Sequence, residues 1–455
     1  MPPAKRAHDP AGRRRRRGTH MLCAPIDVSV DDAAVGVVID GDTVAMMVGV
    51  WGAPYVPTLL HPHRADTSNT LPVSVVAAQM QQYGLPVDVD IICEGRRTVR
   101  DNYAEHYQTL LAGRPAAGQR TTTVLVRLDS RARDTLGGLS WRRDNVSATI
   151  AATQRIVRAL NQNGCRAHIL TAAQIREAMA ASLGGREGLT GTYRDEWSRL
   201  STGKGYLTSY FFSSDDVAAA ALADVWSYPC DHAALVVGLR RGAGAIRASA
   251  MVRLHTSQPY ASPPALMLNK FTGRQWDAVV STLPVRARLR LPSTPLDGEA
   301  LDKAIVVGSS GVLLGKFGDA MLLMPLSDPA APTRIAVRVD DDMAVRRLIR
   351  RAAAVGEHVA VYDTARRWEM SAASARIWSS TDVSAQPPRP PTLVVHNGRS
   401  NPYPGARTAV AVGAPDSSAA DIVIEQAGNR ITLRTNRFAT TLDAVSFRNE
   451  EAYLR

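Results

Sequence analysis

The chain has 455 residues, of which 45% are hydrophobic and 21% are charged. This balance is that of an ordinary globular protein with two or three domains, and it excludes wholesale disorder. Basic residues outnumber acidic ones by 54 to 42, for a net charge of +12. Half of that charge lies in the first twenty residues, where seven basic residues stand against one acidic residue.

The cysteines and the hydropathy pattern indicate the compartment. Cys23, Cys93, Cys165 and Cys230 lie far apart and form no CxxC pair. This argues against a disulfide framework or a zinc site and favours a reducing, cytoplasmic setting. No stretch approaches the roughly 20 apolar residues of a membrane-spanning helix, and no apolar signal-peptide segment follows the basic run. The residues alone therefore predict a soluble chain.

Residues 1–25 are predicted to be a flexible basic arm, because they contain Pro, Gly, Arg and His without hydrophobic periodicity. The phosphates of nucleic acid and anionic lipid headgroups both attract such a segment. A solvated tail that binds nothing in particular is the simplest alternative, and the residues alone leave all three open. The candidate residues for contact with a membrane surface are Arg13, Arg14, Arg15, Arg16 and Arg17.

The main α/β domain is predicted over residues 26–290. Asp40-Gly41 between two apolar runs is typical of a tight β-hairpin. Strands and helices alternate after it, which predicts a sheet covered by helices. The expected elements are a helix over 73–83, strands over 87–93 and 121–128, a helix over 144–163, a strand over 165–170 and a helix over 171–179.

The rest of this domain is predicted to consist mostly of a loop and strands. A Gly-rich polar loop is expected over 184–205, and two strands over 233–239 and 245–254 are joined by Arg-Gly-Ala-Gly. Antiparallel pairing of these two strands predicts a mixed sheet, and hence the fold class α/β (α+β). A helix is expected within 266–283, and residues 284–298, with three prolines and several basic residues, are predicted to be a linker.

A second, smaller α/β subdomain is predicted over 300–380, followed by a Pro-linked, β-rich extension over 381–455. Short strands are expected over 304–308, 311–314 and 320–325. A helix is expected to begin at Asp340–Asp342, where negative charge suits the helix dipole. This helix has one apolar side, and its opposite side carries Arg346, Arg347, Arg350 and Arg351.

A search for catalytic motifs finds none with the required spacing. Gly308–Phe317 is the nearest approach to a P-loop, but its spacing is wrong and Phe317 replaces the magnesium-binding hydroxyl, so a turn is preferred. His61 and His63 form a close pair without an evident further ligand. Asp215-Asp216 resembles the acidic pair of a sugar-nucleotide enzyme, although a helix N-terminus explains it more simply. No catalytic residue, cofactor or metal site is predicted.

Residues 122–178 carry a resemblance to a known family. Their sequence, TTVLVRLDS and then SWRRDNVSATIAATQRIVRALNQNGCRAHILTAAQIREA, resembles the EccE family, a core component of the type VII (ESX) secretion machinery. Shorter stretches at 195–206, 268–275 and 308–325 resemble the same family. The resemblance spans roughly residues 35–362, and its motifs are structural ones.

The resemblance implies a structural subunit of a membrane complex, not an enzyme. EccE proteins have N-terminal transmembrane helices and a large cytoplasmic domain, and they assemble with EccB, EccC and EccD at the inner membrane. The family pattern implies no catalytic residue, cofactor, nucleic acid or small-molecule substrate. This sequence lacks the membrane helices, and in EccE proteins an Arg-rich stretch follows the second of them. We therefore expect Arg13–Arg17 to lie at the anionic membrane surface, with the native N-terminus upstream.

Two other classes of function remain open on the sequence. A cytosolic nucleotide-sugar-dependent transferase would use Asp215-Asp216 as its metal site. A nucleic-acid-associated protein would act through the basic arm, and its binding would weaken steeply with salt. A secretion-complex subunit is preferred, because it accounts for both the missing catalytic motifs and the basic arm.

Overall fold

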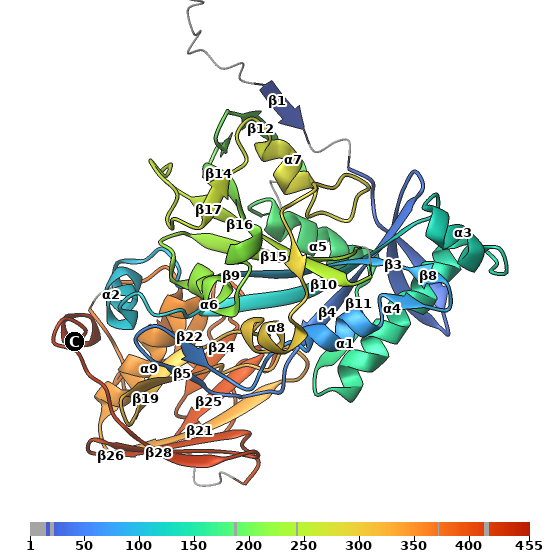
Figure 1. Cartoon of the computed structure of the whole chain (residues 1–455). Helices are drawn as coiled ribbons and strands as arrows, with labels where there is room; N and C mark the ends of the chain where they lie inside the picture. Colours follow the sequence, from blue (N-terminus) through green and yellow to red (C-terminus); the bar gives the residue numbers. More distant parts are fainter. Residues whose placement is uncertain (1–14, 19–21, 186–188, 243, 372, 414–417) are drawn as a thin grey trace, which may run out of the picture.

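The computed structural model describes residues 15–18, 22–185, 189–242, 244–371, 373–413 and 418–455. Two large β-sheets with helices packed on them form the molecule, which confirms the predicted mixed α/β class (Figure 1). Within the described ranges, no helix has both the length and the apolar character needed to cross a bilayer.

The larger sheet has 14 strands, and every pairing within it is antiparallel. Three short strands pair at its sides: β11 (Arg166–Ile169) with β4, β17 (Leu268–Lys270) with β14, and β18 (Thr294–Pro295) with β16. The order along the sheet is β1 (Arg15–Gly18), β12 (Thr192–Asp195), β13 (Leu200–Thr202), β14 (Gly205–Phe212), β16 (Ile246–Thr256), β15 (His232–Arg241), β9 (Asp88–Arg96), β10 (Gln119–Asp129), β4 (Thr43–Trp51), β3 (Ala33–Asp40) and β2 (Ile26–Val30).

Helices cover both faces of this sheet (Figure 1). One face packs against α1 (Val73–Ala78), α4 (Asn145–Gln162), α6 (Ala219–Asp224) and α8 (Gly298–Ala304) in the largest apolar cluster. The other face packs against α5 (Ala172–Ser182) and α7 (Gln275–Val280). The short helix α3 (Arg133–Leu139) lies against the small hairpin of β7 (Gln81–Gln82) and β8 (Leu85–Pro86).

Several local predictions are confirmed. The strands β3 and β4 form the expected hairpin, with Asp40 paired to Thr43 and Gly41 at a φ of +59°, where glycine is favoured. The helix expected over 144–163 is α4, and at its start Asp144 accepts a hydrogen bond from the Ser147 amide at 2.7 Å. Thr171 caps α5 with a complete capping box. These features depend on contacts between near neighbours in the chain, so the sequence predicts them well.

The second sheet has 12 strands and is mixed. Its strands are parallel from β23 to β26 and antiparallel beyond. The order is β23 (Ile377–Ser380), β22 (Val359–Tyr362), β24 (Leu393–His396), β25 (Thr408–Val412), β21 (Thr333–Val339), β26 (Ile422–Ala427), β27 (Arg430–Thr435), β28 (Ala439–Asp443), β19 (Val312–Phe317), β20 (Ala320–Met324), β5 (Thr58–Leu60) and β6 (Ala65–Asp66).

This sheet differs from the predicted division of the chain. Residues 300–380 and 381–455 were expected to be a subdomain and an extension, but strands from both ranges alternate in the one sheet. The strands β5 and β6 join it from the first part of the chain, through pairing of Leu60 with Met321. The strand expected over 304–308 is only a single bridge between Thr70 and Val306.

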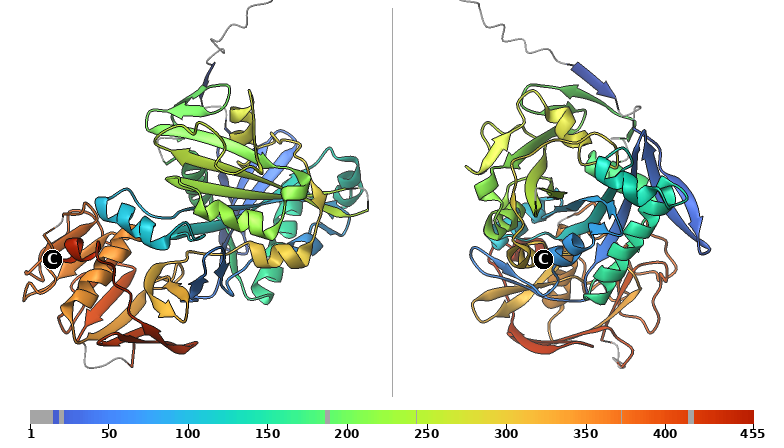
Figure 2. Two further views of the ribbon diagram at one scale, coloured as in Figure 1. Left: turned by 60° about the vertical axis from the view of Figure 1, so that its left-hand side comes forward. Right: turned by 45° about the vertical axis from the view of Figure 1, so that its right-hand side comes forward.

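The long helix α9 (Asp342–Val355) packs on the second sheet together with α2 (Asn102–Leu111) and α10 (Glu451–Leu454) (Figure 2). The sequence predicted an apolar side of this helix and an opposite side that carries arginines, but it did not predict that two of these arginines are buried. Arg350 and Arg351 are only 1% and 2% exposed, because α2 and α10 cover the side of α9 that carries them. Arg351 instead pairs with Glu450, with Nε 2.8 Å from Oε1.

Candidate functional site

The basic arm meets the body of the protein at β1. Arg15, Arg16 and Arg17 pair in register with Asp195, Arg194 and Tyr193 of β12, so this part of the arm is an edge strand. Arg13 and Arg14 lie outside the described residues. The structure therefore differs from the predicted flexible arm at Arg15–Gly18, which form a strand. The reason is that the edge of β12 offers backbone hydrogen-bonding groups with which a strand can pair.

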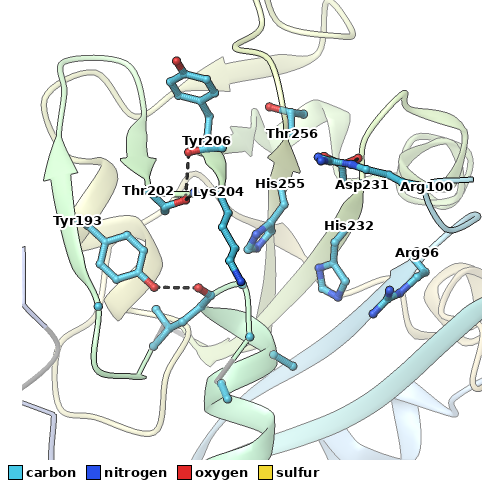
Figure 3. A pocket seen from close by; sticks show the side chains of 18 of the residues that line it. Arg96, Arg100, Tyr193, Thr202, Lys204, Tyr206, Asp231, His232, His255 and Thr256 are labelled. Atoms are coloured by element: carbon cyan, nitrogen blue, oxygen red, sulfur yellow. Dashed lines mark hydrogen bonds and ion pairs between the residues drawn. The ribbon is translucent and has the colours of Figure 1, made fainter. Parts of the chain in front are cut away.

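A polar pocket of about 700 Å³ opens beside β12 (Figure 3). The C-terminal end of α5, the β13–β14 turn, and the ends of β9, β15 and β16 surround it. Tyr193 of β12 fixes one wall by donating a hydrogen bond from its hydroxyl to the Leu183 carbonyl at 2.8 Å. We call this the histidine pocket, after His232 and His255 in its wall.

Cations and acids both line the histidine pocket. The cations are Arg96, Arg100 and Lys204, and the acids are Glu177 and Asp231. Arg100 and Asp231 form an exposed two-pronged ion pair, with Nε 2.6 Å from Oδ1. Such an exposed pair contributes little to stability, but it holds the guanidinium in one orientation at the pocket rim.

The two histidines lie on adjacent strands, with their ring centroids 5.2 Å apart and the rings nearly perpendicular (Figure 3). Burial and the nearby charges of Arg253 and Arg96 lower the pKa of His232 to about 3. Burial, together with His232 and Arg253, holds the pKa of His255 well below its usual range. Both rings are therefore neutral at physiological pH.

Each ring keeps one buried nitrogen without a hydrogen-bond partner among the described residues. These atoms are Nδ1 of His232 and Nε2 of His255. The thiol of Cys230 is next to Asp231 in the sequence, and burial raises its pKa to about 12, so it remains protonated. The pocket has the geometry of a binding site for a polar or anionic group, without an activated nucleophile from Cys230.

The histidine pocket escaped the motif search because its residues are dispersed along the chain. Arg96, His232 and His255 come from three strands, and no short motif joins them. A signal was present in β9, whose charged residues Asp88, Asp90, Glu94 and Arg96 are separated by two or four positions. Residues separated by multiples of two lie on the same face of a strand. The sequence could therefore have predicted that one face of this strand is polar, whereas it was expected to be a buried apolar strand.

The other candidate residues do not come together into a catalytic or metal site. Asp215 is exposed and Asp216 half-buried in the short helix η3 (Ser214–Asp216), ahead of α6. His61 pairs with Asp66 at 3.2 Å. In the part of the chain that the structure describes, no three His, Cys, Asp or Glu side chains are grouped to hold a metal ion.

The glycine-rich segment 308–315 serves the contact between the sheets. The hydroxyl oxygens of Ser309 and Ser310 accept hydrogen bonds from the amides of Arg120 and Ala117, at 3.0 and 3.2 Å. The Nε of Arg120 donates to the Gly308 carbonyl at 2.7 Å. These bonds give the segment a structural role in place of phosphate binding.

An exposed aromatic patch lies around α3. Tyr83, Leu136 and Trp141 are 70%, 55% and 65% exposed. The guanidinium of Arg142 lies 3.8 Å from the centre of the Trp141 ring and donates a hydrogen bond to the Tyr83 carbonyl. We call these four residues the α3 patch. Trp, Tyr and Arg are the residues that most often dominate binding at protein interfaces.

Comparison with known proteins links this architecture to a family. The EccE family model, whose description names a type VII ESX secretion system translocon, matches residues 116–212. That range contains three of the four residues of the α3 patch, the helices α3 to α5, and the strands β12 to β14 at the histidine pocket.

Three relatives carry the same name. The chain is 31% identical over 252 residues to the ESX-5 secretion system protein EccE5 of Mycobacterium marinum, covering 52% of this chain and 62% of the relative. It is 25% identical over 383 residues to the ESX-2 secretion system protein EccE2 of Mycobacterium tuberculosis, covering 81% and 68%. It is 26% identical over 259 residues to the EccE5 protein of that species, covering 53% and 63%. The chain thus spans less than two thirds of the length of the EccE5 relatives.

These matches define the class of protein as a component of the type VII secretion machinery. Within that class, the match over residues 116–212 and the three relatives support a component of the EccE type.

Proposed function

We propose that this chain is a structural, non-catalytic subunit of an ESX membrane complex, where it supports assembly and protein export across the inner membrane. The observation that carries this proposal is the EccE match over residues 116–212. The same residues contribute β10, β11 and β12 to β14 to the larger sheet and carry the exposed Trp141. A rigid sheet that presents an exposed aromatic and arginine surface suits a subunit that positions its neighbours.

The proposed partners are the other core components EccB, EccC and EccD. The α3 patch is the proposed contact with one of them, because Trp141 and Tyr83 expose large apolar rings beside Arg142. An exposed patch of this kind buries apolar area on docking, whereas scattered exposed residues contribute little.

The proposed location is the cytoplasmic side of the inner membrane, with Arg13–Arg17 at the anionic lipid surface. The pairing of Arg15–Gly18 with β12 supports this, since it fixes the arm to one edge of the larger sheet. The body would then face the membrane with that edge. Each basic residue near such a surface gains about 1 kcal/mol.

The proposal is tested by recovering the chain from mildly solubilised membranes through a tag after Arg455. We expect a large complex with multispanning partners and an ATPase. Trp141→Ala should reduce the recovery of at least one partner, whereas Trp197→Ala, at an exposed tryptophan outside the α3 patch, should not. Recovery as a free protein would overturn the proposed function, and equal recovery with both variants would overturn the role of the α3 patch.

A further inference from the structure

A second hollow, of about 640 Å³, lies where β9 begins, at the opposite end of this strand from Arg96. Its walls come from β15, β16, the residues after α7 and the extended segment 288–293. We call it the arginine hollow. The arginines that line it are Arg240, Arg241, Arg247, Arg288 and Arg290.

Cations outnumber carboxylates at the arginine hollow. Arg127 is buried behind it and shares one carboxylate with Arg240. Six guanidinium groups meet three carboxylates, which leaves an excess of three positive charges. The ion pairs are Asp90 with Arg127 and Arg240, Asp88 with Arg288, and Asp134 with Arg241.

Two of the arginines have no carboxylate partner in the part of the chain that the structure describes. Arg247 donates only to the hydroxyl and carbonyl oxygens of Ser293, with Nε 2.9 Å from Oγ. Arg290 makes no hydrogen bond or ion pair with any residue that the structure describes. Like charges held around a hollow repel one another, and an anion in the hollow would offset this repulsion.

We infer that the arginine hollow binds a phosphate monoester, held by Arg247 and Arg290. The planar guanidinium fork matches phosphate oxygens in pairs, and two negative charges suit the excess of three positive ones. The hydroxyl of Ser249 also lines the hollow and donates to the Gly238 carbonyl at 3.4 Å, a long bond that it can exchange for one to a phosphate oxygen. A free sugar or glycerol phosphate and a lipid with a terminal phosphate share this chemistry. The inference goes beyond the proposed secretion role and does not depend on it.

The test uses the purified full chain and isothermal titration calorimetry at pH 7 with glycerol 3-phosphate. We expect saturable binding of one equivalent. The double variant Arg247→Gln, Arg290→Gln should weaken it about tenfold or more, since each arginine supplies a charged hydrogen bond. Arg286→Gln is the matched control, because Arg286 is an exposed arginine two residues before this extended segment and does not line the hollow. If the double variant unfolds, Arg290→Gln alone serves the same purpose, because Arg290 is exposed.

The source of the phosphate is distinguished by competition with vesicles that contain phosphatidic acid. Displacement of glycerol 3-phosphate by these vesicles, absent in the Arg290→Gln variant, identifies a lipid headgroup. Binding of the soluble ester that vesicles do not disturb identifies a free metabolite. Absence of saturable binding, or equal binding by Arg286→Gln and the double variant, would overturn the inference.

Discussion

Glu450 is a buried acid, 1% exposed, just ahead of α10. Its carboxylate accepts hydrogen bonds from the Tyr103 hydroxyl at 2.5 Å and from the Nε and Nη2 groups of Arg351. Arg347 lies 3.4 Å from the same carboxylate. One residue therefore ties α2, α9 and α10 together, and its loss leaves Arg351 as an uncompensated buried charge.

We predict that Glu450→Ala lowers the free energy of unfolding by about 3–5 kcal/mol, the usual effect of removing one partner from a buried ion pair. Urea denaturation followed by circular dichroism measures this loss. Glu451→Ala is the control, because Glu451 is an exposed neighbour, and it should change stability by less than about 0.5 kcal/mol. Similar losses in the two variants would show that the buried network is not important for stability.

The buried histidines of the histidine pocket make the stability of the protein depend on pH. The folded state holds the pKa of His232 near 3, whereas the unfolded chain has the ordinary value of 6.5. The unfolded state then binds the proton as pH falls from 6.5 towards 3, so stability is present above 6.5 and declines below it. His255 acts in the same direction. Each histidine contributes a slope of at most about 1.4 kcal/mol per pH unit.

We predict that His232→Asn makes the unfolding free energy less dependent on pH between 6.5 and 4. The neighbouring charges of Arg96 and Arg253 stay in place, so the change reports the histidine. Urea midpoints at pH 7 and pH 5 measure it, with His63→Asn at an exposed histidine as the control. An unchanged pH dependence in His232→Asn would contradict the neutral, buried state of this ring.

At the scale of elements, α3 contains two adjacent glycines in very different surroundings. A Cβ atom on Gly137 would meet no heavy atom within 4 Å. A Cβ atom on Gly138 would overlap the carbonyl oxygen of Gly84, because α3 lies directly against the chain at the β7–β8 hairpin. The close approach at Gly138 fixes the position of α3, and with it the position of Leu136 in the α3 patch.

We predict opposite effects for these neighbours. Gly137→Ala should stabilise the protein by about 0.5–1 kcal/mol through helix propensity. Gly138→Ala should destabilise it by about 1–3 kcal/mol, because α3 has to move away from Gly84. Thermal unfolding of both variants measures the difference. Equal shifts of the same sign would mean that α3 is not held against the hairpin.

The basic arm, also an element of the fold, is expected to bind anionic membranes. Replacing Arg13–Arg17 by glutamine should reduce partition onto vesicles of anionic lipid at least a hundredfold, since five residues contribute about 1 kcal/mol each. Vesicle sedimentation measures this, and 0.5 M salt should weaken the wild-type binding as well. Arg430, Arg434 and Arg437, exposed on the second sheet and changed together to glutamine, are the control. Equal binding by both variants would exclude the arm as the membrane contact.

The elements that the sequence predicts well are those fixed by near neighbours. The hairpin at Gly41 and the caps of α4 and α5 depend on residues a few positions apart. The burial of Arg350 and Arg351 was not predictable, because periodicity shows which side of a helix is apolar but not what covers the other side. The histidine pocket combines strand ends from three parts of the chain. The charged residues two or four positions apart in β9 were therefore its only signal in the sequence.

At the scale of the whole molecule, the first part of the chain supplies β5 and β6 to the second sheet, and side-chain contacts also join the two sheets. The strand β5 pairs with β20, and the Tyr55 hydroxyl lies 2.9 Å from the Thr333 Oγ1. Arg166 on β11 forms an ion pair of 2.9 Å with Asp328. The segment 284–298, predicted to be a linker, lies against the larger sheet through the pairing of β18 with β16. The two halves are therefore interlocked.

We predict that the full chain unfolds in one cooperative transition, and that a fragment of residues 22–296 is markedly less stable than the chain. The fragment lacks β20, with which β5 pairs, and it also lacks the residues that Tyr55 and Arg166 contact. Differential scanning calorimetry of the chain and of the fragment measures this. A fragment that melts at the temperature of the full chain would show that the larger sheet is an independent folding unit.

The pairing of β5 with β20 also has a consequence for biosynthesis. Leu60 pairs with Met321, so the two partners are 261 residues apart in the chain. At a synthesis rate of about 5–20 residues per second, β5 leaves the ribosome roughly 13–52 s before β20 exists. During that interval β5 can pair only with β6, so its other edge stays open, and open strand edges readily join other chains. The pairing of β5 with β20 therefore cannot form until about 320 residues have been synthesised, and a holding chaperone would protect the nascent chain until β20 emerges.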